Sequence, residues 1–307
     1  MADKILYIEA PDGISGDMVL GALIDLGIDP DVIRQELDKF VQGEYALLPH
    51  KFERNGIHGI NLEVLAADDP EEYSHGHSHE NSNDHSHGLG DLVHEFNYAQ
   101  EDEVPSEHGL GDHVHEYDFF SGSSSVKYAH RLYKEIRGMI LASGISKTAK
   151  TYALAIFDEI ASAEAAVHKV NKEDVGFHEV GAMDSIIDIV GTAVAIEQLG
   201  DVDIYCSAVR DGSGMIMSRH GIIPVPVPAV MEMAKGADIP IIIESDVKTE
   251  MVTPTGFGII KGLRAKFEPG LGIIPEKTGY GFGKRDTGRI GAVRVTIGEK
   301  YEKPEEK

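Results

Sequence analysis

Two carboxylates and an imidazole stand close together in the segment FHEVGAMDSIID at positions 177–188. If a helix begins just before Asp184, then Asp184 and Asp188 lie four residues apart on one helix face, and His178 lies on the entering loop. Such a group could hold a metal ion or position an acid and a base. Alternatively, Asp184 only complements the helix dipole and Asp188 is exposed to solvent. The apolar residues on both sides of Asp188 favour a functional role.

A second group of metal-binding side chains is the His-rich segment, which holds nine of the fifteen histidines between His75 and His115. Neutral imidazole is a good ligand for nickel, copper and zinc, and a flexible tract lets several rings converge on one ion. The alternative is a solvated insertion without function. The candidate metal ligands in this segment are His75, His77, His79, His85, His87, His113 and His115.

The sequence DGISGD at positions 12–17 follows an apolar run and precedes an apolar-periodic stretch. A glycine turn between a strand and a helix can bind phosphate through backbone N–H groups, with Ser15 and Gly16 at the helix start. No lysine follows the glycines, so the turn is not a P-loop. A phosphate here would need a bridging cation held by Asp12 or Asp17. A purely structural turn is the alternative.

A third loop, GSGMIMSRHG at positions 212–221, is followed by the proline-rich run PVPVP. Its glycines, including Gly214, and its histidine, His220, indicate a loop that lines a substrate site. His220 could serve as a metal ligand or as a general acid or base. An ordinary surface loop with a structural histidine is the alternative.

The sequence TPTG at positions 253–256 predicts the start of a helix. The hydroxyls of Thr253 and Thr255, together with the first N–H groups of the helix, would suit a phosphate or a carboxylate. A simple helix cap explains the pattern as well.

The elements that must position these side chains alternate loosely between strands and helices, which predicts an α/β or α+β fold of mixed sheets with packed helices. We expect strands near 4–10, in a hairpin at 46–66 turning at Asn55-Gly56, and at 203–209, 239–244 and 292–297, with 239–244 buried on both faces. We expect helices near 18–26, 29–40, 126–142, 147–168, 182–199, 229–235 and 254–264. Gly27 should end the first of these helices, and Asp29 with Pro30 should cap and begin the second.

Charge is distributed unevenly along the chain. The net charge is −24, and the stretch 55–126 has sixteen acidic residues and no Lys or Arg, which leaves −8 (−24 less −16) elsewhere. The expected organisation is an N-terminal αβ region at 1–67, a disordered His-rich acidic insertion at 68–125, a main αβ domain at 126–300 and a polar tail at 301–307.

The acidity argues against binding to nucleic acid or to an anionic membrane, since both would repel the chain. No run approaches the length of a membrane span, and no signal peptide is visible. We therefore expect a soluble cytoplasmic protein.

Taken together, the motifs resemble one known family. The runs DGISGDMVLGALIDLG at 12–27, HEVGAMDSIIDIVG at 178–191, GSG at 212–214, HGIIPVP at 220–226 and TPTG at 253–256 are similar to the nickel-insertion proteins of nickel-pincer nucleotide cofactor synthesis (LarC). A His-rich insertion at this place is also common in that family. The blocks occur in the family's order and cover most of the chain outside 68–125.

The resemblance implies a nickel chelatase of the lyase type, which inserts nickel into a pyridinium bisthiocarboxylate mononucleotide with consumption of CTP. The product would be the cofactor of a lactate racemase-type apoenzyme. Family members often continue into a C-terminal part thought to bind CTP and metal (Mg²⁺ or Mn²⁺), so we expect that site outside this chain, on a possible separate polypeptide.

In this interpretation the His-rich segment collects nickel and passes it to a firmer site around His178, Asp184, Asp188 and His220. The substrate's phosphate and thiocarboxylates would lie against the loops at Ser15, Gly214 and Thr255. Two other functions fit the residues: a nickel storage or delivery protein without chemistry, and a phosphohydrolase that depends on Mg²⁺ or Mn²⁺.

Overall fold

The structure is a computed structural model that describes residues 4–41, 45–66, 131–177 and 180–301. All of these residues belong to one compact unit. The His-rich segment expected at 68–125 lies outside the described residues, as do His178 and Glu179. The division of the chain into an N-terminal region, an insertion and a main domain remains a prediction.

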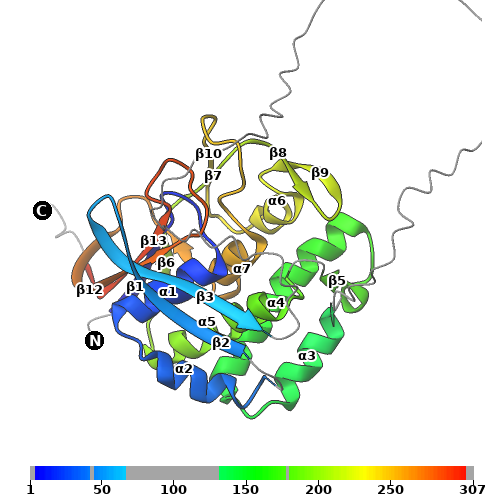
Figure 1. Cartoon of the computed structure of the whole chain (residues 1–307), viewed down its shortest axis with the longest axis horizontal. Helices are drawn as coiled ribbons and strands as arrows, with labels where there is room; N and C mark the ends of the chain where they lie inside the picture. Colours follow the sequence, from blue (N-terminus) through cyan, green and yellow to red (C-terminus); the bar gives the residue numbers. More distant parts are fainter. Residues whose placement is uncertain (1–3, 42–44, 67–130, 178–179, 302–307) are drawn as a thin grey trace, which may run out of the picture. The chain divides into compact units, whose positions relative to one another are not determined.

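A seven-stranded mixed sheet forms the framework of the unit (Figure 1). In spatial order the strands are β11 (Lys266–Phe267), β6 (Asp203–Cys206), β1 (Lys4–Glu9), β13 (Ala292–Tyr301), β12 (Gly272–Phe282), β3 (Ile57–Ala66) and β2 (Tyr45–Arg54). β1 runs parallel to β6 and antiparallel to β13, and β12 runs antiparallel to β13 and parallel to β3.

The remaining strands form three two-stranded ribbons: β4 (Arg131–Leu132) with β5 (Gly176–Phe177), β7 (Val209–Asp211) with β10 (Ile241–Ile243), and β8 (Gly214–Ser218) with β9 (Gly221–Val225). The helices are α1 (Gly16–Leu26), α2 (Pro30–Leu37), α3 (Tyr133–Ala142), α4 (Lys147–His168), α5 (Met183–Gln198), α6 (Pro228–Ala234) and α7 (Pro254–Gly262), with a 3₁₀ turn at Lys172–Asp174. This arrangement confirms the expected class of mixed sheets with packed helices.

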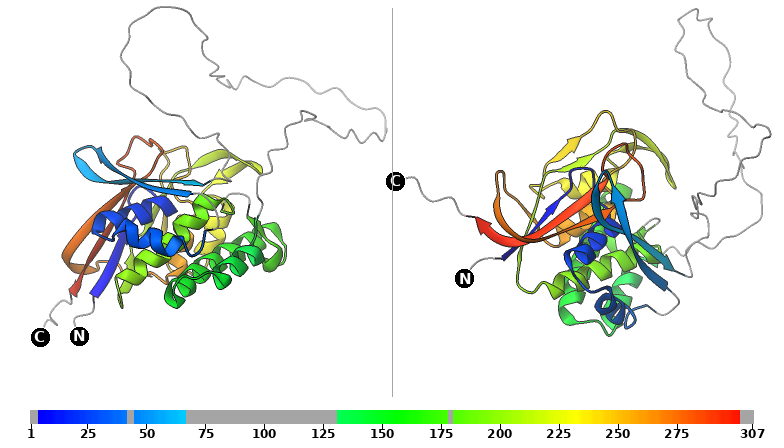
Figure 2. Two further views of the ribbon diagram at one scale, coloured as in Figure 1. Left: turned by 60° about the horizontal axis from the view of Figure 1, so that its bottom comes forward. Right: turned by 60° about the vertical axis from the view of Figure 1, so that its left-hand side comes forward.

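The helices pack in layers on the sheet (Figure 2). α1 lies on β12 and β3, α5 packs on α1, and α4 packs on α5 and α7. α1 and α5 are buried on more than one side, and residues around most of the circumference of each helix are apolar. This composition is typical of a helix enclosed by other elements. The start of each of these two helices is therefore held rigidly by the core.

Glycines on β12 let α1 approach the sheet closely. A Cβ at Gly281 would lie 1.8 Å from the carbonyl oxygen of Met18, and one at Gly279 would lie 2.3 Å from that of Ala22. Any other residue at these positions would push the helix off the strand. The glycines and Pro275 also explain why the sequence analysis did not predict β12, because both residue types are typical of turns.

Several local predictions are confirmed. Asn55 and Gly56 turn the β2–β3 hairpin with φ values of 54° and 78°. Asp29 caps α2 by accepting a hydrogen bond from the backbone N–H of Asp31, and Gly27 ends α1 in the left-handed conformation. Thr253 caps α7 as expected from TPTG.

Several predicted elements have different bounds. The last strand runs to Tyr301 rather than to 297, and α2 ends at Leu37 rather than at 40. The helix expected at 126–142 begins only at Tyr133, because Arg131 and Leu132 pair with β5 and the Glu135 side chain accepts the backbone N–H of Leu132, which sets the helix start. The strand expected at 203–209 ends at Cys206, and Val209–Asp211 leaves the large sheet to pair with β10.

The prediction that 239–244 is a strand buried on both faces is wrong. Only Ile241–Ile243 is a strand, and Ile242 and Ile243 are 39% and 48% exposed. β10 pairs with β7 alone, outside the large sheet, so its side chains are not enclosed between two layers. Among the described residues, no helix is both long enough and apolar enough to cross a bilayer.

Candidate functional site

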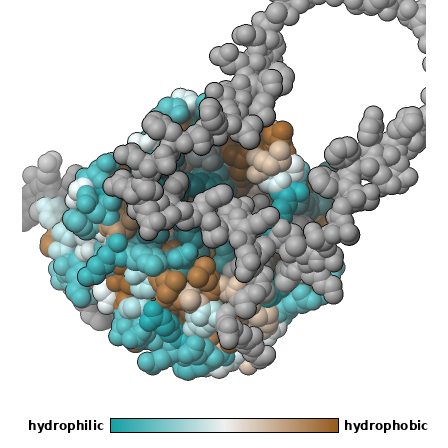
Figure 3. Space-filling model, in the orientation of Figure 1, coloured by the Kyte–Doolittle hydropathy of each residue, from teal (hydrophilic) through white to brown (hydrophobic). Residues whose placement is uncertain are grey.

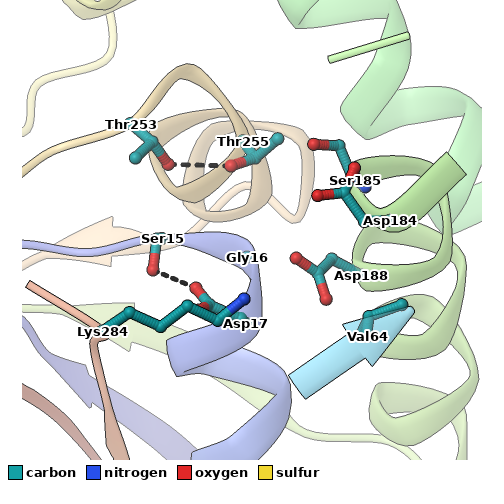
Figure 4. Close-up of a pocket in the computed structure, with 10 residues that line it drawn as sticks. All are labelled: Ser15, Gly16, Asp17, Val64, Asp184, Ser185, Asp188, Thr253, Thr255 and Lys284. Carbon is teal, nitrogen blue, oxygen red and sulfur yellow. Dashed lines mark hydrogen bonds between the residues drawn. The ribbon is translucent and has the colours of Figure 1, made fainter. Parts of the chain in front are cut away.

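Three helices begin around one pocket of about 180 Å³ (Figure 4). α1 contributes its cap and first turn, α5 its first two turns, and α7 its cap and first turn. The residues that line the pocket are Ser15, Gly16, Asp17, Val64, Asp184, Ser185, Asp188, Thr253, Thr255 and Lys284. Most of the polar candidate residues from the motifs outside the His-rich segment thus line one pocket.

The starts of α1 and α7 are joined through their backbones. The N–H of Ile14 donates to the carbonyl of Met251 at 2.9 Å, and the N–H of Thr253 donates to the carbonyl of Ile14 at 3.0 Å. Gly13 allows this contact, because it has a φ of 94° and a Cβ there would lie 2.2 Å from the carbonyl oxygen of Met251. The glycine turn predicted to bind phosphate therefore also fixes two helix starts side by side.

Hydroxyls lie at both of these helix starts. Thr253 Oγ1 accepts the backbone N–H of Gly256 at 3.1 Å and lies 2.7 Å from Thr255 Oγ1. Ser15 is at the cap position of α1, but its hydroxyl donates to Asp17 Oδ1 instead of capping the helix. The N–H groups of the first turn of α1 thus receive no side-chain cap from Ser15.

The start of α5 brings carboxylates to the same pocket. Asp184 is in the first turn and Asp188 follows one turn later, so both lie on one face as the spacing predicted. Gly16 makes the approach of α1 possible, since a Cβ at that position would lie 2.9 Å from Asp188 Cβ. The alternative that Asp188 is exposed on the surface is wrong, because its Oδ1 is inaccessible to solvent.

The charged side chains of the pocket shift the pKa values of its carboxyl groups in opposite directions. Burial raises the pKa of Asp188 well above its ordinary value, and the negative charges of Asp17 and Asp184 raise that pKa further. Burial also raises the pKa of Asp184, partly offset by a hydrogen bond from the backbone N–H of Ser185. The positive charge of Lys284 lowers the pKa of both carboxyl groups.

Lys284 was not found by sequence reasoning. It lies on the connection between β12 and β13, and among the described residues that line the pocket it is the only cationic side chain. Arg285 anchors this connection by donating to the carbonyl of Glu250 at 3.0 Å, and Arg289 binds Glu244 and Asp246, each at 2.9 Å. The glycine-rich run GYGFGK at 279–284 was the available signal in the sequence.

The arrangement can bind opposite charges at once. Three helix N-termini present N–H groups and the positive ends of their dipoles to the pocket, and Lys284 adds a full positive charge, which together attract an anion. The carboxylates of Asp17, Asp184 and Asp188 attract a cation. A ligand that carries both an anionic group and a metal ion fits this chemistry.

Comparison with known proteins identifies the family. The sequence profile described as "Nickel insertion protein" matches residues 6–307. The chain belongs to this nickel insertion family. The resemblance noted in the five sequence blocks is thereby confirmed, and the pocket is built largely from residues of those blocks.

Relatives in the nickel insertion family carry a more specific name. Pyridinium-3,5-bisthiocarboxylic acid mononucleotide nickel insertion proteins of Lactiplantibacillus plantarum and Acetivibrio thermocellus are each 39% identical to this chain over 298 and 300 residues, or 97% and 98% of it. A protein of the same name from Staphylococcus epidermidis is 36% identical over 92% of the chain. The matches cover 62%, 61% and 56% of these three relatives, so the chain spans about three fifths of their length. No solved structure matches the chain.

Three of the candidate residues do not line the pocket. Asp12 accepts the backbone N–H of Gly291 at 3.3 Å and lies 3.7 Å from Arg289, which ties the β12–β13 connection to the glycine turn. Gly214 begins β8. His220 lies at the β8–β9 turn, where its ring is 4.8 Å from that of His168.

The segment predicted to be a substrate-lining loop is a β-hairpin, β8–β9. Its apolar side chains Met215, Met217 and Ile222 are 57%, 76% and 65% exposed, and apolar residues gather over this hairpin in Figure 3. None of its residues lines the pocket. Gly221, with a φ of 84°, adjoins the turn of this hairpin, and Gly214, with a φ of 95°, begins β8 at the opposite end.

The predicted metal ligands are only partly described. His178 and the histidines between His75 and His115 lie outside the described residues. Within the described ranges, no group of three or more His, Cys, Asp or Glu side chains is arranged to hold a metal ion. Any metal in the pocket would therefore need ligands beyond the carboxylates described there.

Proposed function

We propose that this chain takes part in inserting nickel into pyridinium-3,5-bisthiocarboxylic acid mononucleotide. The observation that carries the proposal is the pocket where three helix N-termini face three carboxylates, in a chain of the nickel insertion family. The named substrate of the relatives is a mononucleotide with two thiocarboxylic acid groups, so it is an anion whose reaction partner is a divalent cation. A pocket with both kinds of charge suits such a pair.

In this proposal the anionic groups of the substrate bind at the helix starts. Ser15 and Gly16 on α1, and Thr253 and Thr255 on α7, provide N–H groups and hydroxyls. Asp184 receives nickel together with His178, which precedes it by six residues in the sequence. The His-rich segment collects nickel beforehand, because its imidazoles bind late first-row metals and its carboxylates concentrate cations.

We further propose that the insertion is a lyase-type chelatase reaction that consumes CTP, with CTP and Mg²⁺ or Mn²⁺ bound outside these 307 residues. The nickel-containing product would then be transferred to an apoenzyme of the lactate racemase type. A second candidate function, nickel storage or delivery without chemistry, is favoured by the nine histidines between His75 and His115 alone.

The test is incorporation of nickel into the bisthiocarboxylic acid mononucleotide, with CTP, by this chain with and without a C-terminal part from a relative. We expect a nickel-containing nucleotide, detected by mass spectrometry, when the C-terminal part is present. Asp184→Asn should lower the yield by about tenfold or more. Asp201→Asn, at an exposed position after α5, is the matched control. Nickel binding without product in every mixture would instead support storage or delivery.

A further inference from the structure

The pocket at the three helix starts has helix N-termini, hydroxyls and a lysine that attract an anion, and carboxylates that attract a cation. Neither group of side chains forms a full binding site without the other ligand. We propose that the pocket binds a phosphate group and a hard divalent cation, Mg²⁺ or Mn²⁺, as an interdependent pair, and that this cation is distinct from the one that accompanies CTP outside these residues. The identity of the phosphate as that of a mononucleotide rests on the proposed function. The pairing itself rests on the residues of the pocket.

The anion half of the site consists of three helix N-termini, two hydroxyls and a lysine. α1, α5 and α7 have 11, 16 and 9 residues, so each has a substantial dipole and directs its positive end to the pocket. Some first-turn N–H groups are already used: Gly256 donates to Thr253 Oγ1 and Met18 donates to Asp17 Oδ1. Pro254 has no N–H. Thr253 and Thr255 add hydroxyls, and Lys284, which lines the same pocket, adds a positive charge (Figure 4). A phosphate can accept hydrogen bonds from the remaining N–H groups and from these side chains.

The cation half consists of Asp17 and Asp188. Asp188 points into the pocket in Figure 4, and its Oδ1 is inaccessible to solvent and has no hydrogen-bond partner in the described part of the chain. Such a carboxylate oxygen is costly unless a bound group satisfies it. Asp17 Oδ1 accepts the backbone N–H of Met18 at 3.0 Å as well as the Ser15 hydroxyl. The atoms of these two side chains that would bind the cation are all oxygens, which suit Mg²⁺ and Mn²⁺ better than they suit nickel.

Each ligand supplies what the other lacks. Mg²⁺ is usually held by one or two carboxylates together with phosphate oxygens and waters, rather than by a full protein cage. This agrees with the finding that no three acidic or imidazole side chains of the described ranges form a metal site. Conversely, a phosphate near three carboxylates would be repelled unless a cation lies between them. Binding of the two ligands should therefore be positively coupled.

Isothermal titration calorimetry of the purified chain, with inorganic phosphate and Mg²⁺ as probes, tests this pairing. We expect saturating Mg²⁺ to tighten phosphate binding by about tenfold, and saturating phosphate to tighten Mg²⁺ binding by the same factor, because coupling between two sites is reciprocal. Phosphate binding that does not change with Mg²⁺ would overturn the proposal. Coupling produced by Ni²⁺ but not by Mg²⁺ or Mn²⁺ would also overturn it.

Variants separate the two halves. Asp188→Asn should abolish the coupling while phosphate still binds weakly, whereas Lys284→Met should weaken phosphate binding with and without Mg²⁺. Thr253→Ala should also weaken it, and Ser146→Ala is its matched control, because Ser146 caps α4 through the N–H of Ala149 and does not line the pocket. Unchanged coupling in a folded Asp188→Asn protein, checked by thermal unfolding, would remove Asp188 from the site.

These measurements do not depend on nickel insertion. If the coupling is found but no mixture yields the nickel-containing nucleotide, the proposed function fails and the composite site stands. If nickel is inserted but phosphate and Mg²⁺ bind independently, the proposed function stands and the composite site fails.

Discussion

At the scale of single residues, Asp188 is the most unusual group in the pocket. It carries a carboxyl group whose Oδ1 is buried without a hydrogen-bond partner among the described residues, beside two other carboxylates, at the point where α5 touches Gly16 of α1. Keeping this carboxyl ionised in the ligand-free protein costs stability, because burial and neighbouring negative charges favour the protonated form. A residue that destabilises the empty protein in this way is typical of a site arranged for a ligand.

The raised pKa of Asp188 predicts a pH-dependent effect on stability. The folded-state pKa lies above the unfolded value near 3.8, so stability is lost as the pH rises from about 3.8 through the folded-state pKa. Asp188→Asn removes this loss. In metal-free and phosphate-free buffer it should increase the free energy of unfolding by about 1 to 3 kcal/mol at pH 8, with a smaller increase as the pH falls toward 4.

Denaturant unfolding at several pH values between 4 and 8 measures this effect. Asp201→Asn, which changes an exposed carboxylate, should leave stability nearly unchanged across the same range. An Asp188→Asn protein that is less stable than the wild type at pH 8 would show that the carboxylate is well compensated in the folded state.

At the scale of elements, the site depends on how closely helices approach their neighbours. Glycines on β12 place α1 directly on the sheet, Gly16 places the start of α1 against α5, and Gly256 places the start of α7 against Ile14. A Cβ at Gly256 would lie 2.3 Å from the carbonyl oxygen of Ile14. Close contacts at glycines therefore position the helix starts that form the pocket, and packing rather than the loops alone sets its dimensions.

This packing predicts opposite effects for two glycine substitutions. Gly281→Ala should destabilise the protein by about 2 to 3 kcal/mol, because its Cβ would lie 1.8 Å from the carbonyl oxygen of Met18 and must displace α1. Gly138→Ala, in the middle of α3 with no atom within 4 Å of the new Cβ, should stabilise it by about 0.5 to 1 kcal/mol. Chemical denaturation gives both values, and equal effects of the two substitutions would contradict the close contact of α1 with β12.

At the scale of the whole molecule, acidity and histidine are concentrated in a stretch of sequence whose described residues contribute only Val64 to the lining of the pocket. The sixteen acidic residues of 55–126 account for most of the net charge of −24, and nine of the fifteen histidines fall within 75–115. The described lining of the pocket instead consists of residues 15–17, 64, 184, 185, 188, 253, 255 and 284. The proposed function therefore assigns the gathering of metal and the binding of substrate to different parts of the sequence.

Deletion of residues 75–115 should remove most of the nickel that the chain binds while leaving the unfolding temperature nearly unchanged. Imidazole releases metal on protonation, so the nickel lost by deletion should be the fraction that the wild type releases when the pH is lowered from 7.5 to 5. Metal analysis after dialysis measures both.

Replacement of the nine histidines by serine is the control that keeps the length of the segment. It should lower nickel binding to the same extent. If the protein loses its fold on deletion but keeps it after replacement, the segment is needed for folding. Nickel collection would then not be the only role of the segment.

The sequence by itself determined the features that depend on neighbouring residues. The Asn55-Gly56 turn, the caps of α2 and α7, the end of α1 at Gly27 and the i,i+4 placement of Asp184 and Asp188 follow from short-range conformational preferences. The order of the five sequence blocks was also enough to indicate the nickel insertion family, and the profile match confirmed it.

Only the tertiary structure decided which of these pieces share a site. It places the starts of α1, α5 and α7 around one pocket, adds Lys284 from the β12–β13 connection, and puts Gly214 and His220 on a separate hairpin. The physical reason is that these segments are far apart in the sequence and meet through packing of apolar faces and close contacts at glycines. Such contacts depend on the whole core, so no local pattern of residues specifies them.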